Sequence, residues 1–213
     1  MFSRNNNIFV DDLSVTKDNY LIAVLKMLVI FLVINYGTDV SYDHEYVGLF
    51  IILLGVVLLK ILNINLLSFK KLKFTHMLYI IFGFLLMYGL DYLYDTFAPP
   101  TLNEILIDEE SEDAPYHIAL LSTAIIPPIT EEIICRGLII RILFRNHLFL
   151  GFIVSTVFFT LIHESDTLIH ESDTLIGYLP YFYSGLIFGY TYLKTKRLEV
   201  PILIHFINNL LAM

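Results

Sequence analysis

The fold of this chain can be inferred from nine residues, Ile129-Thr130-Glu131-Glu132-Ile133-Ile134-Cys135-Arg136-Gly137. This stretch places two glutamates and an arginine inside a segment that is otherwise apolar enough to lie in a bilayer. Charged side chains are costly there, so each needs a partner or a function. On a helix Glu132 and Arg136 stand four residues apart on one face and can neutralise each other, whereas Glu131 is turned away by about 100°. The stretch therefore predicts a membrane helix with one ion pair and one carboxylate that faces some other group.

The composition extends this prediction to the whole chain. Of its 213 residues, 57% are hydrophobic and only 16% are charged, which is far more apolar than a soluble domain. Residues 1–18 form a polar N-terminal segment, and no Gly, Ser or Pro linker divides the rest. We therefore expect a single transmembrane helical domain over 19–213. The net charge of -8 argues against a nucleic-acid partner, and the single cysteine excludes an intrachain disulfide and a Cys-based zinc cluster.

Apolar runs recur along the domain at intervals that suit membrane helices. Several are shorter than the roughly 20 residues that cross a bilayer upright, so seven spans are predicted, with six and eight as alternatives. The runs are Leu21–Tyr36, Tyr46–Leu62, Met77–Leu93, Ile118–Phe144, Leu148–Ile162, Leu175–Leu193 and Val200–Met213. The predicted fold class is an all-α, polytopic transmembrane helical bundle.

Lysine and arginine alternate with acidic residues from one loop to the next. Cationic loops stay on the cytoplasmic side of a membrane, so this alternation predicts a multi-pass protein of the plasma membrane with a cytoplasmic N-terminus. The basic residues are Arg4, Lys17, Lys60, Lys70, Lys71, Lys73, Arg141, Arg145, Lys194, Lys196 and Arg197. The intervening loops carry acidic residues instead.

Two later spans contain polar groups that apolar packing does not explain. The fifth ends in Phe159-Thr-Leu-Ile-His163, and the seventh contains His205-Phe-Ile-Asn-Asn209. His205 and Asn209 are one helical turn apart and point the same way. Counting about 1.5 Å per residue from the cytoplasmic ends puts these groups and Glu131 at overlapping depths in the membrane. We therefore expect three helices to bring a carboxylate, two imidazoles and an amide together.

Two local features bear on this site. The heptad His163-Glu-Ser-Asp-Thr-Leu-Ile169 is followed at once by an identical copy from His170 to Ile176, which makes His170 a rival for His163. Only His163 has a phenylalanine four residues before it. Pro127-Pro128, just before the glutamates, is expected to break or kink its helix and to free backbone carbonyls that protein or water must satisfy.

Taken in order, these motifs resemble a known family. Glu131-Glu132-x-x-x-Arg136, Phe159-x-x-x-His163 and His205-x-x-x-Asn209 are similar to the three motifs of the CPBP family. That family comprises type II CAAX prenyl endopeptidases and bacterial relatives linked to bacteriocin processing and self-immunity, sometimes labelled Abi. The resemblance covers a motif-bearing core at 116–213, and the first three spans match only as generic membrane helices.

The resemblance implies a role for each motif residue. The first glutamate of the family is taken as the general base for a water, assisted by the histidine of the second motif, which here means Glu131 and His163. The third motif is thought to stabilise the oxyanion, which implies that role for His205 and Asn209. Fixed donors on one helical face suit an oxyanion, where each is worth about 3 kcal/mol in soluble proteases.

A metal-dependent alternative stays open beside this one. Glu132 and Arg136 are implied to support the site rather than to react. Glu131, His163 and His205 could be three ligands of a catalytic zinc, with water in the fourth position. The prenyl endopeptidase members imply a glutamate-dependent, metal-free mechanism, so we favour no cofactor and keep zinc as the alternative.

Three classes of function fit the sequence. The leading hypothesis is an intramembrane endopeptidase that acts on a membrane-associated or lipid-linked peptide, with membrane lipid as its surroundings. The second is a non-catalytic bacteriocin self-immunity or scaffold protein that keeps the motifs without turnover. The third is a transporter with a proton relay of Glu and His, against which no inverted repeat is visible. The chain ends four residues after Asn209, so completion of the site by a second subunit in an oligomer is also left open.

Overall fold

The computed structural model describes residues 8–98, 100–101, 105, 114–163 and 175–213. Over these residues the regular structure is helical and contains no strand. This confirms the predicted all-α bundle. The rival histidine, His170, lies outside the described residues.

The helices follow the apolar runs of the sequence. Six of the helical rods in the described part are α1 (Tyr20–Asp43), α2 (Glu45–Ile61), α3 (Phe74–Phe97), α7 (Leu148–Ile162), α8 (Leu179–Thr195, after the 3₁₀ turn η4, Leu175–Tyr178) and α9 (Glu199–Ala212). The seventh, here called the composite helix, consists of α5 (Tyr116–Ala119), the π-helical η1 (Leu120–Ile125), α6 (Ile126–Glu132) and the π-helical η2 (Ile133–Leu143). Pro127 and Pro128 therefore do not break the helix; they lie at its change from π to α geometry.

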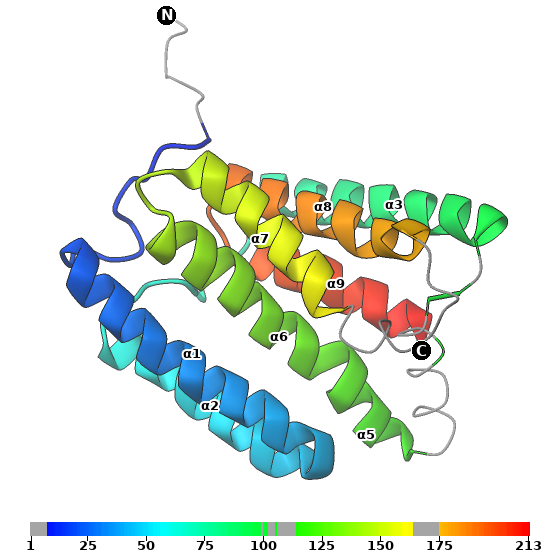
Figure 1. Cartoon of the computed structure of the whole chain (residues 1–213), viewed down its shortest axis with the longest axis horizontal. Helices are drawn as coiled ribbons and strands as arrows, with labels where there is room; N and C mark the ends of the chain where they lie inside the picture. The colour runs from blue at the N-terminus through cyan, green and yellow to red at the C-terminus, as the bar shows by residue number, and fades with distance from the viewer. Residues whose placement is uncertain (1–7, 99, 102–104, 106–113, 164–174) are drawn as a thin grey trace, which may run out of the picture.

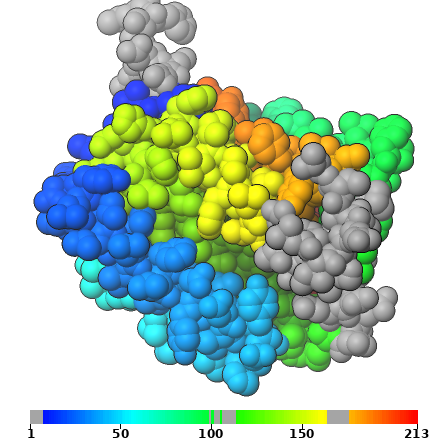
Figure 2. Space-filling view, in the orientation of Figure 1, coloured from blue at the N-terminus to red at the C-terminus, as the bar shows by residue number. Residues whose placement is uncertain are grey.

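The outer surface identifies a membrane protein. Three helices are long and apolar enough to cross a bilayer, namely Tyr20–Asp43, Phe74–Phe97 and Tyr116–Leu143, and α7 and α9 are shorter apolar helices. Large apolar side chains on the outside of the bundle are open to the surroundings, with Leu32 64% exposed and Phe82 65% exposed. Figure 2 shows one face of the bundle, on which α1 in blue and α7 in yellow both lie.

The connection between α1 and α2 differs from the prediction. The sequence placed an acidic loop after Tyr36, but α1 continues to Asp43 and α2 begins at Glu45. The reason is that the polar residues of this last part of α1 stay helical. Thr38 donates a side-chain hydrogen bond to the Ile34 carbonyl, and Ser41 donates one to the Thr38 carbonyl (3.0 and 2.7 Å). Hydropathy alone does not register such local bonding.

The composite helix divides the bundle. Figure 1 shows α1 and α2 as an antiparallel pair on one side of it, with α3, α7, α8 and α9 on the other. The α1–α2 pair contacts the composite helix through α6 and η2, while α7 contacts η2 and α8. The last helix, α9, contacts α3, α8, η1 and α6, so it lies between the two sets. This places the polar faces of α6, α7 and α9 toward one another.

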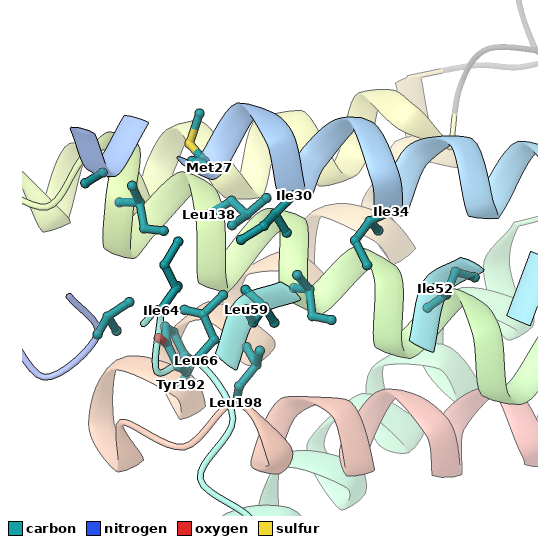
Figure 3. Close-up of a cluster of buried hydrophobic side chains, with 14 of the residues drawn as sticks. Met27, Ile30, Ile34, Ile52, Leu59, Ile64, Leu66, Leu138, Tyr192 and Leu198 are labelled. Carbon is teal, nitrogen blue, oxygen red and sulfur yellow. The ribbon is translucent and has the colours of Figure 1, made fainter. Parts of the chain in front are cut away.

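A buried apolar cluster joins the two sides at one end of the bundle. Figure 3 shows Ile30 and Ile34 of α1 facing Leu138 of η2, with Leu66 and Leu198 from the loops below them. Ile30 and Ile34 have no exposed surface. Lipid is as apolar as these side chains, so close van der Waals packing rather than exclusion of water holds the composite helix against the N-terminal pair.

Gly48 provides a test of the α1–α2 contact. A Cβ at this position would lie 2.6 Å from the Gly37 carbonyl oxygen and 2.5 Å from the Ser41 Cα, so the helices would have to separate. We expect Gly48→Ala to lower the free energy of unfolding by about 1–3 kcal/mol, measured by denaturant titration in micelles. Gly89→Ala is the matched control, because nothing lies within 4 Å of the added methyl group. Equal effects of the two variants would contradict the close packing.

Residues 8–18, the described part of the N-terminal segment, contact basic side chains at one end of the bundle. Arg141, near the end of η2, donates hydrogen bonds to Asp11 (3.1 Å) and Asp12 (2.7 Å). Lys196, directly after α8, donates one to the Ile8 carbonyl (2.9 Å). The side chain of Arg141 is buried. These contacts gather the N-terminal segment and two of the basic loops at the same end.

Lys196 makes this docking sensitive to alkaline pH. Burial, with the charge of Arg141 adding to it, lowers the Lys196 pKa from 10.5 to about 8. Between these values the unfolded chain binds more protons than the folded one, so stability should rise as the pH is raised from about 8 toward 10.5. We expect Lys196→Met to reduce this rise in the thermal midpoint, whereas Lys60→Met should keep it. Identical pH profiles for the two variants would speak against the assignment.

Candidate active site

The ion pair that the sequence predicted on the composite helix is present. Arg136 Nη1 donates to Glu132 Oε1 at 2.9 Å, and both side chains are fully buried. Arg136 Nη2 donates to the Gly185 carbonyl of α8 (3.1 Å), and its guanidinium lies 4.5 Å from the centre of the Phe159 ring of α7. The Gly185 carbonyl and the Phe159 ring thus add to the ion pair on the arginine side, whereas Glu132 Oε2 and Arg136 Nε have no hydrogen-bond partner among the described residues. The pair therefore ties the composite helix to α7 and α8.

Glu131 faces two imidazoles. Its Oε2 atom lies 3.7 Å from His163 Nε2, at the end of α7, and 4.0 Å from His205 Nε2 of α9. This oxygen is buried and accepts no hydrogen bond from the described residues. Leaving such an oxygen without a donor is costly, so the geometry suits a small donor held between the carboxylate and the imidazoles. The proximity of Glu131, His163 and His205 agrees with the sequence prediction.

A hydrogen bond to the backbone determines the tautomer of His163. Its Nδ1 lies 2.8 Å from the Phe159 carbonyl oxygen. A carbonyl only accepts hydrogen bonds, so Nδ1 carries the hydrogen, and in the neutral ring Nε2 has a free lone pair. The ring also stacks on Tyr181 of α8, with centroids 4.5 Å apart and planes 14° from parallel. Two acceptors, Nε2 and Glu131 Oε2, thus face each other.

His205 lies between the two glutamates. While its Nε2 faces Glu131, its Nδ1 is 3.4 Å from Glu132 Oε1. The ring stacks on Phe188 of α8 at a centroid distance of 4.8 Å, and only 5% of the residue is exposed. Sequence reasoning placed Glu131 and Glu132 on different faces, and a single imidazole from α9 reaches both.

Asn209 makes a contact that the sequence did not predict. The sequence paired it with His205 as a second donor to the site. In the structure its amide Nδ2 donates a hydrogen bond to the Thr123 carbonyl of η1 (3.0 Å), eight residues before Glu131 on the composite helix. The structure thus brings His163 and His205 to Glu131 and directs an N–H of Asn209 to the helix backbone.

Tyr181 is a site residue that the sequence did not reveal. Its ring covers one face of His163, and its hydroxyl is 2.9 Å from Thr101 Oγ1. The chain has 14 tyrosines, and tyrosine is common in the interfacial belts of membrane proteins. No spacing marks Tyr181 as different from them, because its position depends on how α8 lies against α7.

The predicted zinc set does not form a metal site as its side chains are placed. Ligand atoms around a tetrahedral zinc lie about 3.4 Å apart, given bonds of about 2.1 Å. The distances from Glu131 Oε2 to His163 Nε2 and His205 Nε2 are longer, at 3.7 and 4.0 Å. In the part of the chain that the structure describes, no three His, Cys, Asp or Glu side chains come close enough to hold a metal ion. Zinc is the alternative to the metal-free mechanism, with Glu131, His163 and His205 as the residues that would hold it.

A comparison with known proteins finds a family model that matches the segment containing this site. Residues 113–211 match the family model described as type II CAAX prenyl endopeptidase Rce1-like. The matched segment contains Glu131, His163, His205 and Asn209. No curated protein and no solved structure matches the chain.

Proposed function

Residues 113–211 belong to the Rce1-like family of type II CAAX prenyl endopeptidases, and from this premise we propose that the protein hydrolyses a peptide bond of a membrane-associated or lipid-linked peptide. At the general level the family makes the chain a membrane endopeptidase. The observation that carries the finer proposal is the convergence of two imidazole Nε2 atoms on the buried Oε2 of Glu131, within 4.0 Å.

The proposed reaction begins with a water held between Glu131 and His163. Both present acceptors, so one water can donate a hydrogen to each and turn its oxygen lone pairs toward the substrate. As this oxygen bonds to the carbonyl carbon of the substrate, Glu131 takes one proton, and the carbonyl π electrons move to the carbonyl oxygen. Glu131 then gives the proton to the leaving nitrogen as the C–N bond breaks.

His205 is proposed to stabilise the charge that develops in this step. In the imidazolium form both ring nitrogens carry a hydrogen, so Nε2 can donate a hydrogen bond to the oxyanion while Nδ1 faces the Glu132 carboxylate. Glu132, 3.4 Å from Nδ1 of the same ring, orients the imidazole, and Arg136 in turn holds Glu132. In this scheme the ion pair is a support for the catalytic histidine and does not touch the substrate.

The membrane setting of the proposal has its own support. Arg141 and Lys196 contact residues 8–18 at one end of the bundle, which is the arrangement expected of basic cytoplasmic loops. We propose the plasma membrane as the location and the cytoplasm as the side of the N-terminus.

Analysis of new peptide termini tests the function without a known substrate. Cells that express the wild-type chain, and cells that express Glu131→Gln at the same level, are compared by mass spectrometry of membrane-derived N-termini. We expect a set of termini that appears only with the wild type. Identical sets of termini in the two membranes would contradict the proposal, and the peptides found become substrates for purified protein.

Chelation tests the metal-free mechanism on such a substrate. Because Glu131 and His163 activate the water in the proposed scheme, we expect the cleavage rate of purified protein in liposomes to be unchanged by a strong zinc chelator. A soluble zinc protease that cleaves the same peptide serves as the control for effective chelation. Loss of activity that added zinc restores would instead support the ligand set Glu131, His163 and His205.

A further inference from the structure

The Thr123 carbonyl has lost both of its possible helical partners. In an α-helix it would accept a hydrogen bond from the N–H of residue 127, and in a π-helix from that of residue 128. Both residues are prolines, which have no N–H. The residue is buried, with 8% of its surface exposed, so water does not readily replace the missing donor. The double proline thus leaves one specific acceptor open inside the bundle.

Asn209 fills this gap from another helix. Its Nδ2 donates to the Thr123 oxygen at 3.0 Å. The same helix, α9, carries His205 one turn earlier, and His205 contacts Glu131 and Glu132. The composite helix and α9 are therefore joined at two places, once at the glutamates and once at the proline-freed carbonyl.

We propose that Asn209 is a positioning residue, whose amide replaces the N–H that Pro127 and Pro128 lack and so holds His205 in register with Glu131. This inference rests on the proposed function, because it concerns the geometry of the same site. It differs from the role expected from the sequence, in which Asn209 donates to the oxyanion. An amide nitrogen has two hydrogens, so the two roles must be separated by experiment.

A rescue experiment separates them. Asn209→Leu keeps a side chain of similar size and removes the donor. Pro127→Ala and Pro128→Ala each restore a backbone N–H, for the α and the π register respectively, and each is combined with Asn209→Leu. We expect Asn209→Leu to lower kcat by roughly 10- to 100-fold with little change in KM, because a displaced catalytic group costs rate. At least one proline replacement should recover most of that loss.

Other results would overturn the proposal. If neither proline replacement recovers kcat in folded protein, Asn209 acts on the reacting atoms themselves. If Asn209→Leu lowers only the thermal midpoint and leaves kcat per folded molecule unchanged, the bond is structural and positions nothing. Asn208→Leu is the matched control, since it removes the adjacent amide from the same helix and should leave kcat unchanged.

Thermal unfolding of single and double variants tests this inference separately from the endopeptidase function. The thermal midpoints of the wild type, Asn209→Leu, the proline variants and the double variants report the carbonyl contact whether or not peptide is cleaved. If Asn209→Leu lowers the thermal midpoint and a proline replacement restores it, the contact between Asn209 and the Thr123 carbonyl is present. If the midpoint does not change in this way, the inference is refuted. Failure of the endopeptidase proposal would appear separately, as identical membrane termini with and without Glu131.

Discussion

Glu131→Gln is expected to reduce peptide hydrolysis by on the order of 10²- to 10⁴-fold, which is what a general base contributes. Glutamine keeps the size of the side chain but cannot take the proton of the attacking water. It also removes the negative charge of the carboxylate, whose buried Oε2 lies 3.7 Å from His163 Nε2 and 4.0 Å from His205 Nε2. The measurement is single-turnover cleavage of an identified substrate by purified protein in liposomes, so that the chemical step is followed directly.

The control for this variant is the same substitution elsewhere. Glu45→Gln changes a carboxylate at the start of α2, on the opposite side of the composite helix from the site, and should cleave at the wild-type rate. Thermal unfolding of both variants checks that they fold. Wild-type cleavage by Glu131→Gln would remove the proposed mechanism, and a cellular effect that survives Glu131→Gln together with His163→Ala would favour the non-catalytic immunity alternative.

Arg136→Met is expected to cause the largest loss of stability, about 3–5 kcal/mol in the free energy of unfolding. It leaves the Glu132 carboxylate fully buried without its 2.9 Å partner. It also takes a donor from the Gly185 carbonyl and a cation from the face of the Phe159 ring. Equilibrium unfolding in mixed micelles measures the effect.

Two further variants show whether this loss of stability comes from the unpaired charge of Glu132. The double variant Glu132→Gln with Arg136→Met removes both charges and should be more stable than Arg136→Met alone, because no unpaired charge remains. Lys26→Met breaks the more exposed pair with Asp18, where the side chains are 24% and 28% exposed, and should cost no more than about 1 kcal/mol. If Arg136→Met costs no more than Lys26→Met, the buried pair does not stabilise the bundle.

The parts of the site that follow from helical spacing were predictable from the sequence. Glu132 and Arg136 pair because they are four residues apart, and α7 has the bounds that its apolar run indicated. The approach of His163 to Glu131 followed from their estimated depths in the membrane. These inferences need only a helix of known rise, which the sequence specifies well.

The remaining features depend on contacts between helices. The π-helical segments hydrogen-bond to the fifth residue back, so a period of 3.6 residues does not give the faces of the composite helix around α6. For this reason the approach of one histidine, His205, to both glutamates and the contact of Asn209 with Thr123 could not be counted from the sequence. The same holds for Tyr181, whose place against His163 depends on the packing of α8.

The way His163 is anchored bears on how the chain could acquire its repeated heptad. Its ring is held by the Phe159 carbonyl of its own helix, four residues earlier, and the first copy of the heptad begins at His163 itself. Extra residues inserted after this point lengthen the connection to the next helix without moving the anchor. The position of His163 relative to Glu131 therefore depends on α7 and not on the length of the segment that follows it.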